Sequence, residues 1–169
     1  INKFHNRKMK KITYLFLLLI LTFIINNCAG YKPIFGQSNL NFEIVNHSIE
    51  GNKMLGTNIY SKFHSLSNSG KNDQNKRSFD IYINSTKKKN ATTKDQSGKI
   101  SEYRITLTTK ADITDFVSGN QIINETVTIS TTYKVQSSYS DTINLENSSI
   151  ENLLNKTYEK LMIIFIENI

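Results

Sequence analysis

Two runs of alternating residues near the middle of the chain constrain the fold more than any other feature. From Tyr103 to Ile113 every second residue is apolar or small, and the residues between them are polar or charged. A second alternating run extends from Glu125 to Val135, and the turn-forming sequence 117–120 separates the two runs. Alternation with a period of two predicts strands that bury one face, and the glycine in the turn predicts an antiparallel hairpin.

Shorter alternating segments predict two more strands before this hairpin. Phe42 and Ile44 mark a short first strand, after which His47 follows. The segment 79–84 alternates throughout and predicts the second strand. The three lysines 87–89 then open a polar segment, so we expect a connection from there to about residue 98.

Two segments have helical periodicity instead. Leu55, Ile59, Phe63 and Leu66 recur every three or four positions, which predicts a helix from about residue 52 to 66. A broad apolar stripe predicts a final helix that reaches the C-terminus, with Ser148 and Glu151 as a capping box at its start. The order strand, helix, three strands, helix predicts an α+β fold. We expect a four-stranded, mostly antiparallel sheet with two amphipathic helices packed on one face.

The first 27 residues have the anatomy of a bacterial signal peptide. Met9-Lys10-Lys11 precedes an apolar run from Ile12 to Ile25, which is shorter than the roughly 20 residues needed to span a bilayer. We expect Met9 to be the true start. The predicted organisation is a signal peptide over 1–27, an N-terminal lipidated tether over 28–40, and a single domain over 41–169.

Cys28, the only cysteine of the chain, lies directly after this apolar run. Bacterial lipoproteins are cleaved and acylated at a cysteine in this place, so we expect Cys28 to carry the lipid. Asn27 is larger than the residue usually found before the cleaved bond, and an uncleaved N-terminal anchor is therefore the alternative. Both interpretations place the domain outside the cytoplasm and hold it at a membrane.

The formal net charge of +7 does not indicate a nucleic-acid-binding domain. Five of the 21 basic residues precede the apolar run, which leaves 16 against 14 acidic residues from Cys28 onward. The electrostatic attraction that nucleic-acid binding needs is thus nearly absent from the exported part. We expect no nucleic-acid partner.

The residues that follow Cys28 resemble a known family. Cys28 is followed, after the one extra residue Ala29, by Gly30-Tyr31-Lys32-Pro33-Ile34-Phe35-Gly36, and this stretch is similar to the start of the mature LPS-assembly lipoproteins (LptE family). These typically read Cys-Gly, an aromatic, any residue, Pro, Leu or Ile, an aromatic, Gly. The order of elements and the hairpin through Gly119 fit the same resemblance.

The resemblance implies a function and partners. It implies a lipoprotein of the Gram-negative outer membrane that faces the periplasm and is held by acyl chains on Cys28. It also implies that the domain plugs a large outer-membrane β-barrel, an LptD-like LPS translocon, and assists lipopolysaccharide assembly. In the tether, we expect five residues to dock the domain to its anchor: Gly30, Tyr31, Pro33, Phe35 and Gly36.

Six basic residues are candidates for contact with the phosphates of lipopolysaccharide. Clustered ammonium groups bind anionic head groups by charge neutralisation, and side chains on strands have fixed geometry. The alternative for the three consecutive lysines is a solvated loop. The candidates are Lys87, Lys88, Lys89, Arg104, Lys110 and Lys134.

The sequence contains no pattern that predicts an enzyme. His47 and His64 are the only histidines after Cys28, and neither stands at metal-ligand spacing from another ligand. No glycine-rich phosphate loop or serine elbow is present. We expect no catalysis, cofactor or metal. The rival hypotheses are a membrane-anchored periplasmic lipid- or solute-binding module without a barrel partner, and a purely structural envelope lipoprotein.

Overall fold

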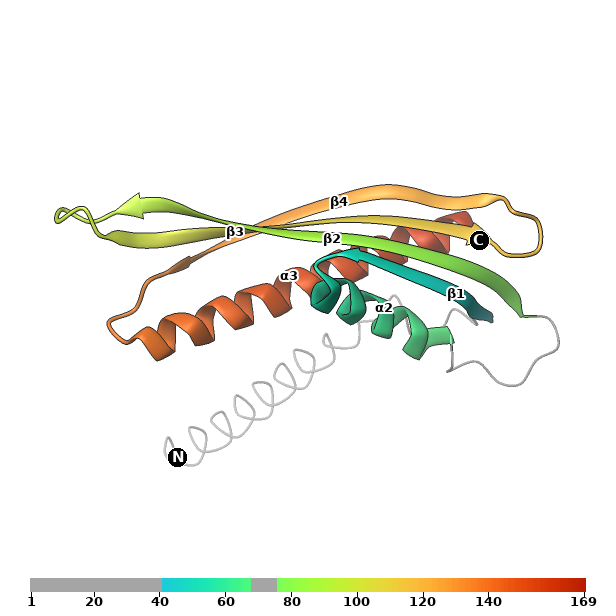
Figure 1. The fold of residues 1–169 in the computed structure, drawn as a ribbon, viewed down its shortest axis with the longest axis horizontal. Helices are drawn as coiled ribbons and strands as arrows, with labels where there is room; N and C mark the ends of the chain where they lie inside the picture. The colour runs from blue at the N-terminus through green and yellow to red at the C-terminus, as the bar shows by residue number, and fades with distance from the viewer. Residues whose placement is uncertain (1–40, 68–75) are drawn as a thin grey trace, which may run out of the picture. The chain divides into compact units, whose positions relative to one another are not determined.

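The structure is a computed structural model that describes residues 41–67 and 76–169 (Figure 1). Six elements follow one another in this part of the chain. They are β1 (Phe42–Gly51), α2 (Lys53–Ser67), β2 (Arg77–Lys94), β3 (Ile100–Asp115), β4 (Gln121–Lys134) and α3 (Tyr139–Asn168). The predicted order of strands and helices is confirmed.

The four strands form one sheet in the order β1-β2-β3-β4. β1 is parallel to β2, because α2 carries the chain back between them, while β2, β3 and β4 form an antiparallel meander. Both helices cover the same face of this sheet (Figure 1). The α+β class and the mostly antiparallel sheet are therefore confirmed.

The buried face of the sheet follows the predicted alternation. On β3, Ile105, Leu107, Ala111 and Ile113 are each at most 2% exposed and face the helices. The polar residues that alternate with this buried face lie on the opposite face, which no element of the described residues covers; they are Arg104, Thr106, Thr108, Lys110 and Asp112. One face of the sheet thus holds the core and the other is open.

Phe165 of α3 is the centre of the core at one end of the sheet. Its ring lies edge-on to Phe42 of β1 at 5.1 Å and to Phe79 of β2 at 5.2 Å between ring centroids. Phe63 of α2 contacts it at 6.1 Å. Edge-to-face pairs of buried rings stabilise a fold by more than the burial of their apolar area alone. This cluster therefore holds four elements together.

Gly56 lets α2 pack closely on β1. A Cβ atom at this position would lie 2.6 Å from Cγ2 of Ile49, well inside van der Waals contact.

Gly119 has a different role, because its φ of +72° suits the turn between β3 and β4. Asp115 closes the same turn by accepting a hydrogen bond from the backbone N–H of Ser118 at 2.9 Å. The predicted hairpin is confirmed.

The predicted connection from Lys87 to about residue 98 is wrong. β2 continues to Lys94, and only residues 95–99 join it to β3. Backbone pairing with β3 explains the longer strand, because Lys87, Lys88 and Lys89 oppose Leu107, Thr106 and Ile105. This strand accommodates a run of lysines because Lys88 lies on the open face, while Lys87 and Lys89 face the carboxylate of Glu146.

Two other boundaries differ from the predictions. β1 extends through His47 to Gly51, with a bulge between Ile44 and Asn46 that interrupts the alternation. α3 begins at Tyr139 rather than at Ser148, because polar side chains hold its first turns: Glu146 accepts a hydrogen bond from Tyr133 of β4, and Thr142 accepts one from the backbone N–H of Gln136. Because these contacts are made by polar side chains, the apolar periodicity of the sequence does not reveal them.

No helix in 41–67 or 76–169 combines the length and the apolar character that crossing a membrane requires.

Candidate binding surface

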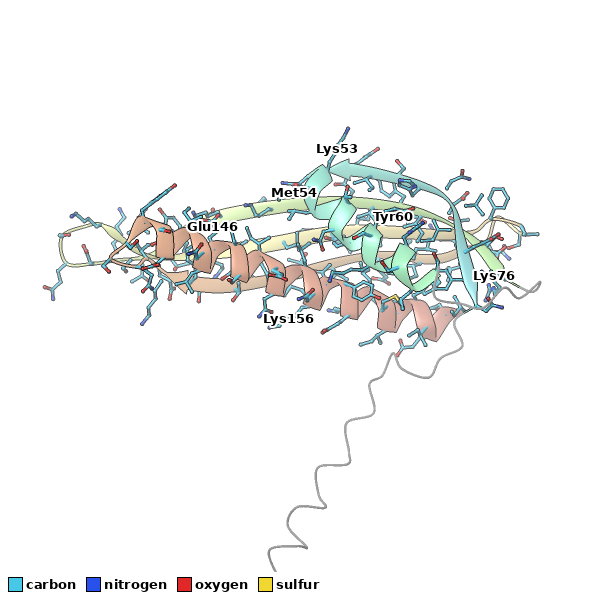
Figure 2. All side chains as sticks on the ribbon, turned by 90° about the horizontal axis from the view of Figure 1, so that it is seen from below. Lys53, Met54, Tyr60, Lys76, Glu146 and Lys156 are labelled. Atoms are coloured by element: carbon cyan, nitrogen blue, oxygen red, sulfur yellow. The ribbon has the colours of Figure 1, made fainter. Side chains whose placement is uncertain are left out.

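A charged and aromatic cluster joins the far end of the sheet to the N-terminal half of α3, where Figure 2 shows Glu146. Its carboxylate accepts a hydrogen bond from Nζ of Lys89 at 2.5 Å and from the hydroxyl of Tyr133 at 2.8 Å. Nζ of Lys87 lies 3.9 Å from the other carboxylate oxygen. The Lys89 ammonium also lies 4.4 Å from the ring centroid of Tyr103, within cation–π distance. Five side chains from four elements therefore form one network.

Burial and hydrogen bonding shift the pKa values of Glu146 and Lys89 in opposite directions. Burial raises the pKa of the Glu146 carboxyl, but the hydrogen bonds from Lys89 and Tyr133 outweigh it and hold that pKa below its ordinary value. Burial lowers the pKa of Lys89, and the bond to Glu146 more than compensates, so the pKa is raised. Both groups are consequently charged at neutral pH.

The six predicted phosphate contacts are divided between the two faces of the sheet. Lys87 and Lys89 face the helices and bind Glu146, so their charge is partly neutralised within the domain. Lys88 alternates with them and lies on the open face. The structure therefore separates three lysines that are consecutive in the sequence.

Three of the six candidates come together on the open face. Lys88 opposes Thr106, Arg104 opposes Thr132, and Lys134 opposes Glu102, which places the three cations on a diagonal across β2, β3 and β4. Lys110 lies six residues along β3 from Arg104, roughly 20 Å at 3.3 Å per residue. We call Lys88, Arg104 and Lys134 the basic diagonal.

An open groove of about 740 Å³ lies at the same end, between the β2–β3 turn and the first turns of α3. Lys89, Lys94 and Lys99 supply its positive charge. Apolar and aromatic groups line the rest, among them Ile100, Tyr103, Val135, Tyr139 and Ile143. This combination suits a ligand that has both an anionic and an apolar part.

The opposite end of the open face is acidic. A hollow of about 400 Å³ there includes Asp80 and Asp112 among its lining residues. Asp80 accepts a hydrogen bond from the amide of Asn46 at 2.9 Å, and Asp112 accepts from the amide of Gln121 at 3.1 Å. The two carboxylates are bonded to neutral donors, so the open face is negative near β1 and positive near the basic diagonal.

Both histidines of the described residues lie beside Tyr60 of α2. The ring of His47 is stacked on Tyr60 of α2 at 4.1 Å, and His64 is exposed on the same helix with its ring 5.6 Å from Tyr60. Within 41–67 and 76–169, no group of three or more His, Cys, Asp or Glu residues is arranged to hold a metal ion.

Other predicted site residues lie outside the described part of the chain. They are Cys28, Gly30, Tyr31, Pro33, Phe35 and Gly36. The lipid attachment and the tether therefore stay predictions.

Sequence reasoning missed Glu146, Tyr103 and Tyr133 as members of a site. Tyr103 and Tyr133 occupy inward positions of the two alternating runs, and their rings stack at 5.8 Å. Two tyrosines that continue the inward face of the two strands beyond their aliphatic residues were a sign that the core becomes polar at this end. Glu146 gave no such sign, because it precedes the apolar stripe of the last helix.

Comparison with solved structures shows which proteins share this fold. No family model matches the sequence, and neither does any curated protein. The chain is similar to the rare lipoprotein B of Shewanella oneidensis, with a TM-score of 0.54 and 9% identity over 73% of this chain and 95% of that one. It is also similar to a lipoprotein B of Nitrosomonas europaea, described as uncharacterized, with a TM-score of 0.56 and 14% identity over 82% and 90% of the two chains. At these identities the likeness establishes that this chain shares its fold with bacterial lipoproteins.

Proposed function

We propose that the chain is a non-catalytic lipoprotein of the outer membrane, anchored by acyl chains on Cys28, that partners the β-barrel through which lipopolysaccharide is assembled. The observation that carries the proposal is the fold shared with bacterial lipoproteins, found in a chain whose Cys28 is followed by the motif 30–36. The open, polar face of the sheet supports it, because a domain inside a barrel needs a wettable surface toward the wall.

The first experiment is capture of the C-terminally tagged protein from its native membrane in detergent. We expect a large β-barrel in equal amount and an N-terminal peptide whose mass corresponds to an acylated Cys28. The control is Cys28→Ala, which should lose the acyl mass and leave the outer-membrane fraction. A protein that is captured alone, with its apolar leader still attached, would refute the proposal.

The contact with lipopolysaccharide is tested separately. The basic diagonal presents three cations at fixed spacing, and such a geometry favours binding of phosphate groups. We expect Arg104→Glu to weaken binding of lipopolysaccharide in a sedimentation or fluorescence assay. Lys110→Glu is the matched control, because it makes the same charge change on the same strand and face. Equal losses in both variants would show that net charge, not the basic diagonal, controls binding.

A second function is favoured by the groove at the end of the sheet. Its volume of about 740 Å³ lies in the range of small-ligand sites, and both lysines and apolar residues line it. A membrane-anchored module that binds a lipid or solute without a barrel is therefore the alternative. A co-purified small amphiphile in the absence of a barrel would favour this function.

A further inference from the structure

Two consecutive apolar side chains are exposed at the tip of the β3–β4 hairpin. Phe116 is 49% exposed and Val117 is 85% exposed. Within 41–67 and 76–169, no other two large apolar residues that are exposed stand next to each other in the sequence. Turns are formed mostly by glycine, proline, asparagine, aspartate and serine. This tip therefore presents an apolar surface where polar residues are usual.

The turn does not need these two side chains for its own structure. The Asp115 carboxylate accepts hydrogen bonds from the backbone N–H groups of Val117 at 3.2 Å and Ser118 at 2.9 Å. The Asp115 carbonyl accepts another from the N–H of Gly119 at 2.9 Å. Because all of these bonds use the backbone or the aspartate, the apolar side chains of the tip are held in place but have no role in the turn.

The tip lies at the end of the domain where the chain arrives from Cys28. The backbone N–H of Arg77 donates to the carbonyl of Asn41 at 3.2 Å, and that of Phe116 donates to the carbonyl of Ser78 at 2.8 Å. Only β2 therefore lies between Asn41 and the tip, a separation of two strand spacings or roughly 10 Å. Figure 1 shows the start of β1 and the loop between β3 and β4 at the same end of the sheet.

The chain that joins the predicted anchor to this end is short. The 13 steps from Cys28 to Asn41 span at most roughly 45 Å when fully extended. β3, with 16 residues, extends roughly 50 Å further to the β2–β3 turn at the opposite end. An acyl anchor thus keeps the tip near the lipid surface, where a local concentration on the order of millimolar allows even a weak contact to form.

We propose that Phe116 and Val117 insert into the interface of the lipid leaflet that holds the acyl chains of Cys28, as a second membrane contact of the domain. This contact rests on the acyl anchor of the proposed function. It goes beyond that function because it assigns the surface that touches lipid and, with it, the orientation of the domain. The end that carries the basic diagonal and the groove then points away from this leaflet.

The contact is compatible with a barrel wall along the open face of the sheet. That face consists of the outward side chains of the strands, whereas the tip lies beyond the ends of β3 and β4. A wall along the open face leaves the tip at the mouth of the barrel. The short tether holds this mouth on the side of the leaflet that contains the anchor.

Charge does not carry the contact. Residues 116–121 have no charged side chain, and Asp115 is paired with Arg77 at 3.4 Å. Asp80 and Asp112, in the acidic hollow, would be repelled by an anionic surface. Burial of the apolar tip is therefore the driving force, and we expect the contact to form on a zwitterionic lipid.

The experiment uses a tryptophan as the only source of indole fluorescence, because the natural sequence contains none. The full-length acylated variant Val117→Trp is reconstituted into phosphatidylcholine vesicles. Its emission is compared between ordinary lipid and lipid with brominated acyl chains, since bromine quenches indole only at close range. A side chain inserted at the boundary of head groups and acyl chains should lose about half of its emission or more.

Two further variants separate insertion from simple proximity. Gln96→Trp is the matched control, because Gln96 is exposed in the β2–β3 turn at the opposite end of the sheet. Its emission should be the same in both lipids. Phe116→Ser, added to Val117→Trp, removes the larger apolar side chain and should abolish most of the quenching. Far-ultraviolet circular dichroism checks that each variant is folded.

The mass of the N-terminal peptide, measured on the same vesicles, separates the tip contact from the anchor. Unquenched emission of an acylated Val117→Trp protein would overturn the proposal and leave the anchor in place. Equal quenching of Val117→Trp and Gln96→Trp would also overturn it, because the domain would then lie flat on the lipid. A blue shift that occurs without quenching, and only when a barrel is added, would overturn it in favour of a protein contact. A protein without acyl mass that does not bind vesicles would refute the anchor of the proposed function, and the tip contact with it.

Discussion

Replacement of Glu146 by glutamine tests how the far end of the sheet is held to α3. The carboxylate is 13% exposed and accepts two hydrogen bonds, from Lys89 at 2.5 Å and from Tyr133 at 2.8 Å. A hydrogen bond to a charged partner contributes about 1.5–3 kcal/mol, but the Lys89 side chain is 34% exposed and its share is reduced by solvent. Glutamine keeps one oxygen as a neutral acceptor. We therefore expect Glu146→Gln to lower the free energy of unfolding by about 1–2 kcal/mol at pH 7.

The same variant should lose its effect at low pH. The pKa of Glu146 is held below its ordinary value in the folded protein, so its carboxylate stabilises the fold above the unfolded-state pKa of about 4.3. This contribution disappears as the pH falls through the folded-state pKa. The difference between natural protein and variant should thus be constant near neutral pH and shrink below about pH 4.

The assay is urea unfolding followed by far-ultraviolet circular dichroism, at neutral pH and again at pH 3. Glu151→Gln is the matched control, because Glu151 is an exposed carboxylate on the same helix. Its unfolding should match that of the natural protein at both pH values. Equal stability of Glu146→Gln and the natural protein at pH 7 would refute the reasoning, as would a deficit that persists unchanged at pH 3.

Three other changes have expected outcomes. Phe165→Ala removes a fully buried ring that contacts three others, and thermal or urea unfolding should show a loss of about 3–5 kcal/mol. Gly56→Ala places a Cβ 2.6 Å from Ile49, which should cost about 1–3 kcal/mol in the same measurement, although alanine favours helices. Cys28→Ser should abolish labelling by a radioactive fatty acid, whereas retained label would exclude Cys28 as the lipid site.

The sheet and the choice of its buried face were predictable from the sequence, because alternation over β3 and β4 is long and regular. Ile105, Leu107 and Ile113 are buried as their positions predict. The bulge in β1 was not predictable, since one inserted residue shifts the alternation without changing composition.

The candidate site was predictable only in part. Arg104 and Lys134 were singled out as strand residues, and the register brings them together with Lys88. The role of Lys89 depends on Glu146, which is 57 residues away in the sequence, and no local pattern connects the two. The cluster also has polar side chains where a core pattern would have apolar ones, so periodicity placed the start of α3 too late.

The aromatic cluster around Phe165 has a consequence for the order of folding. Phe42 is the first residue of the first strand, and Phe165 stands four residues from the end of the sequence given, yet their rings are 5.1 Å apart. On the proposed route of export the N-terminal end crosses the membrane first. The core around these rings cannot close until the last helix has also crossed, so the domain stays open during passage and folds after it. Contacts between residues so distant in the chain form slowly. The chain therefore stays unfolded while it is threaded through the membrane.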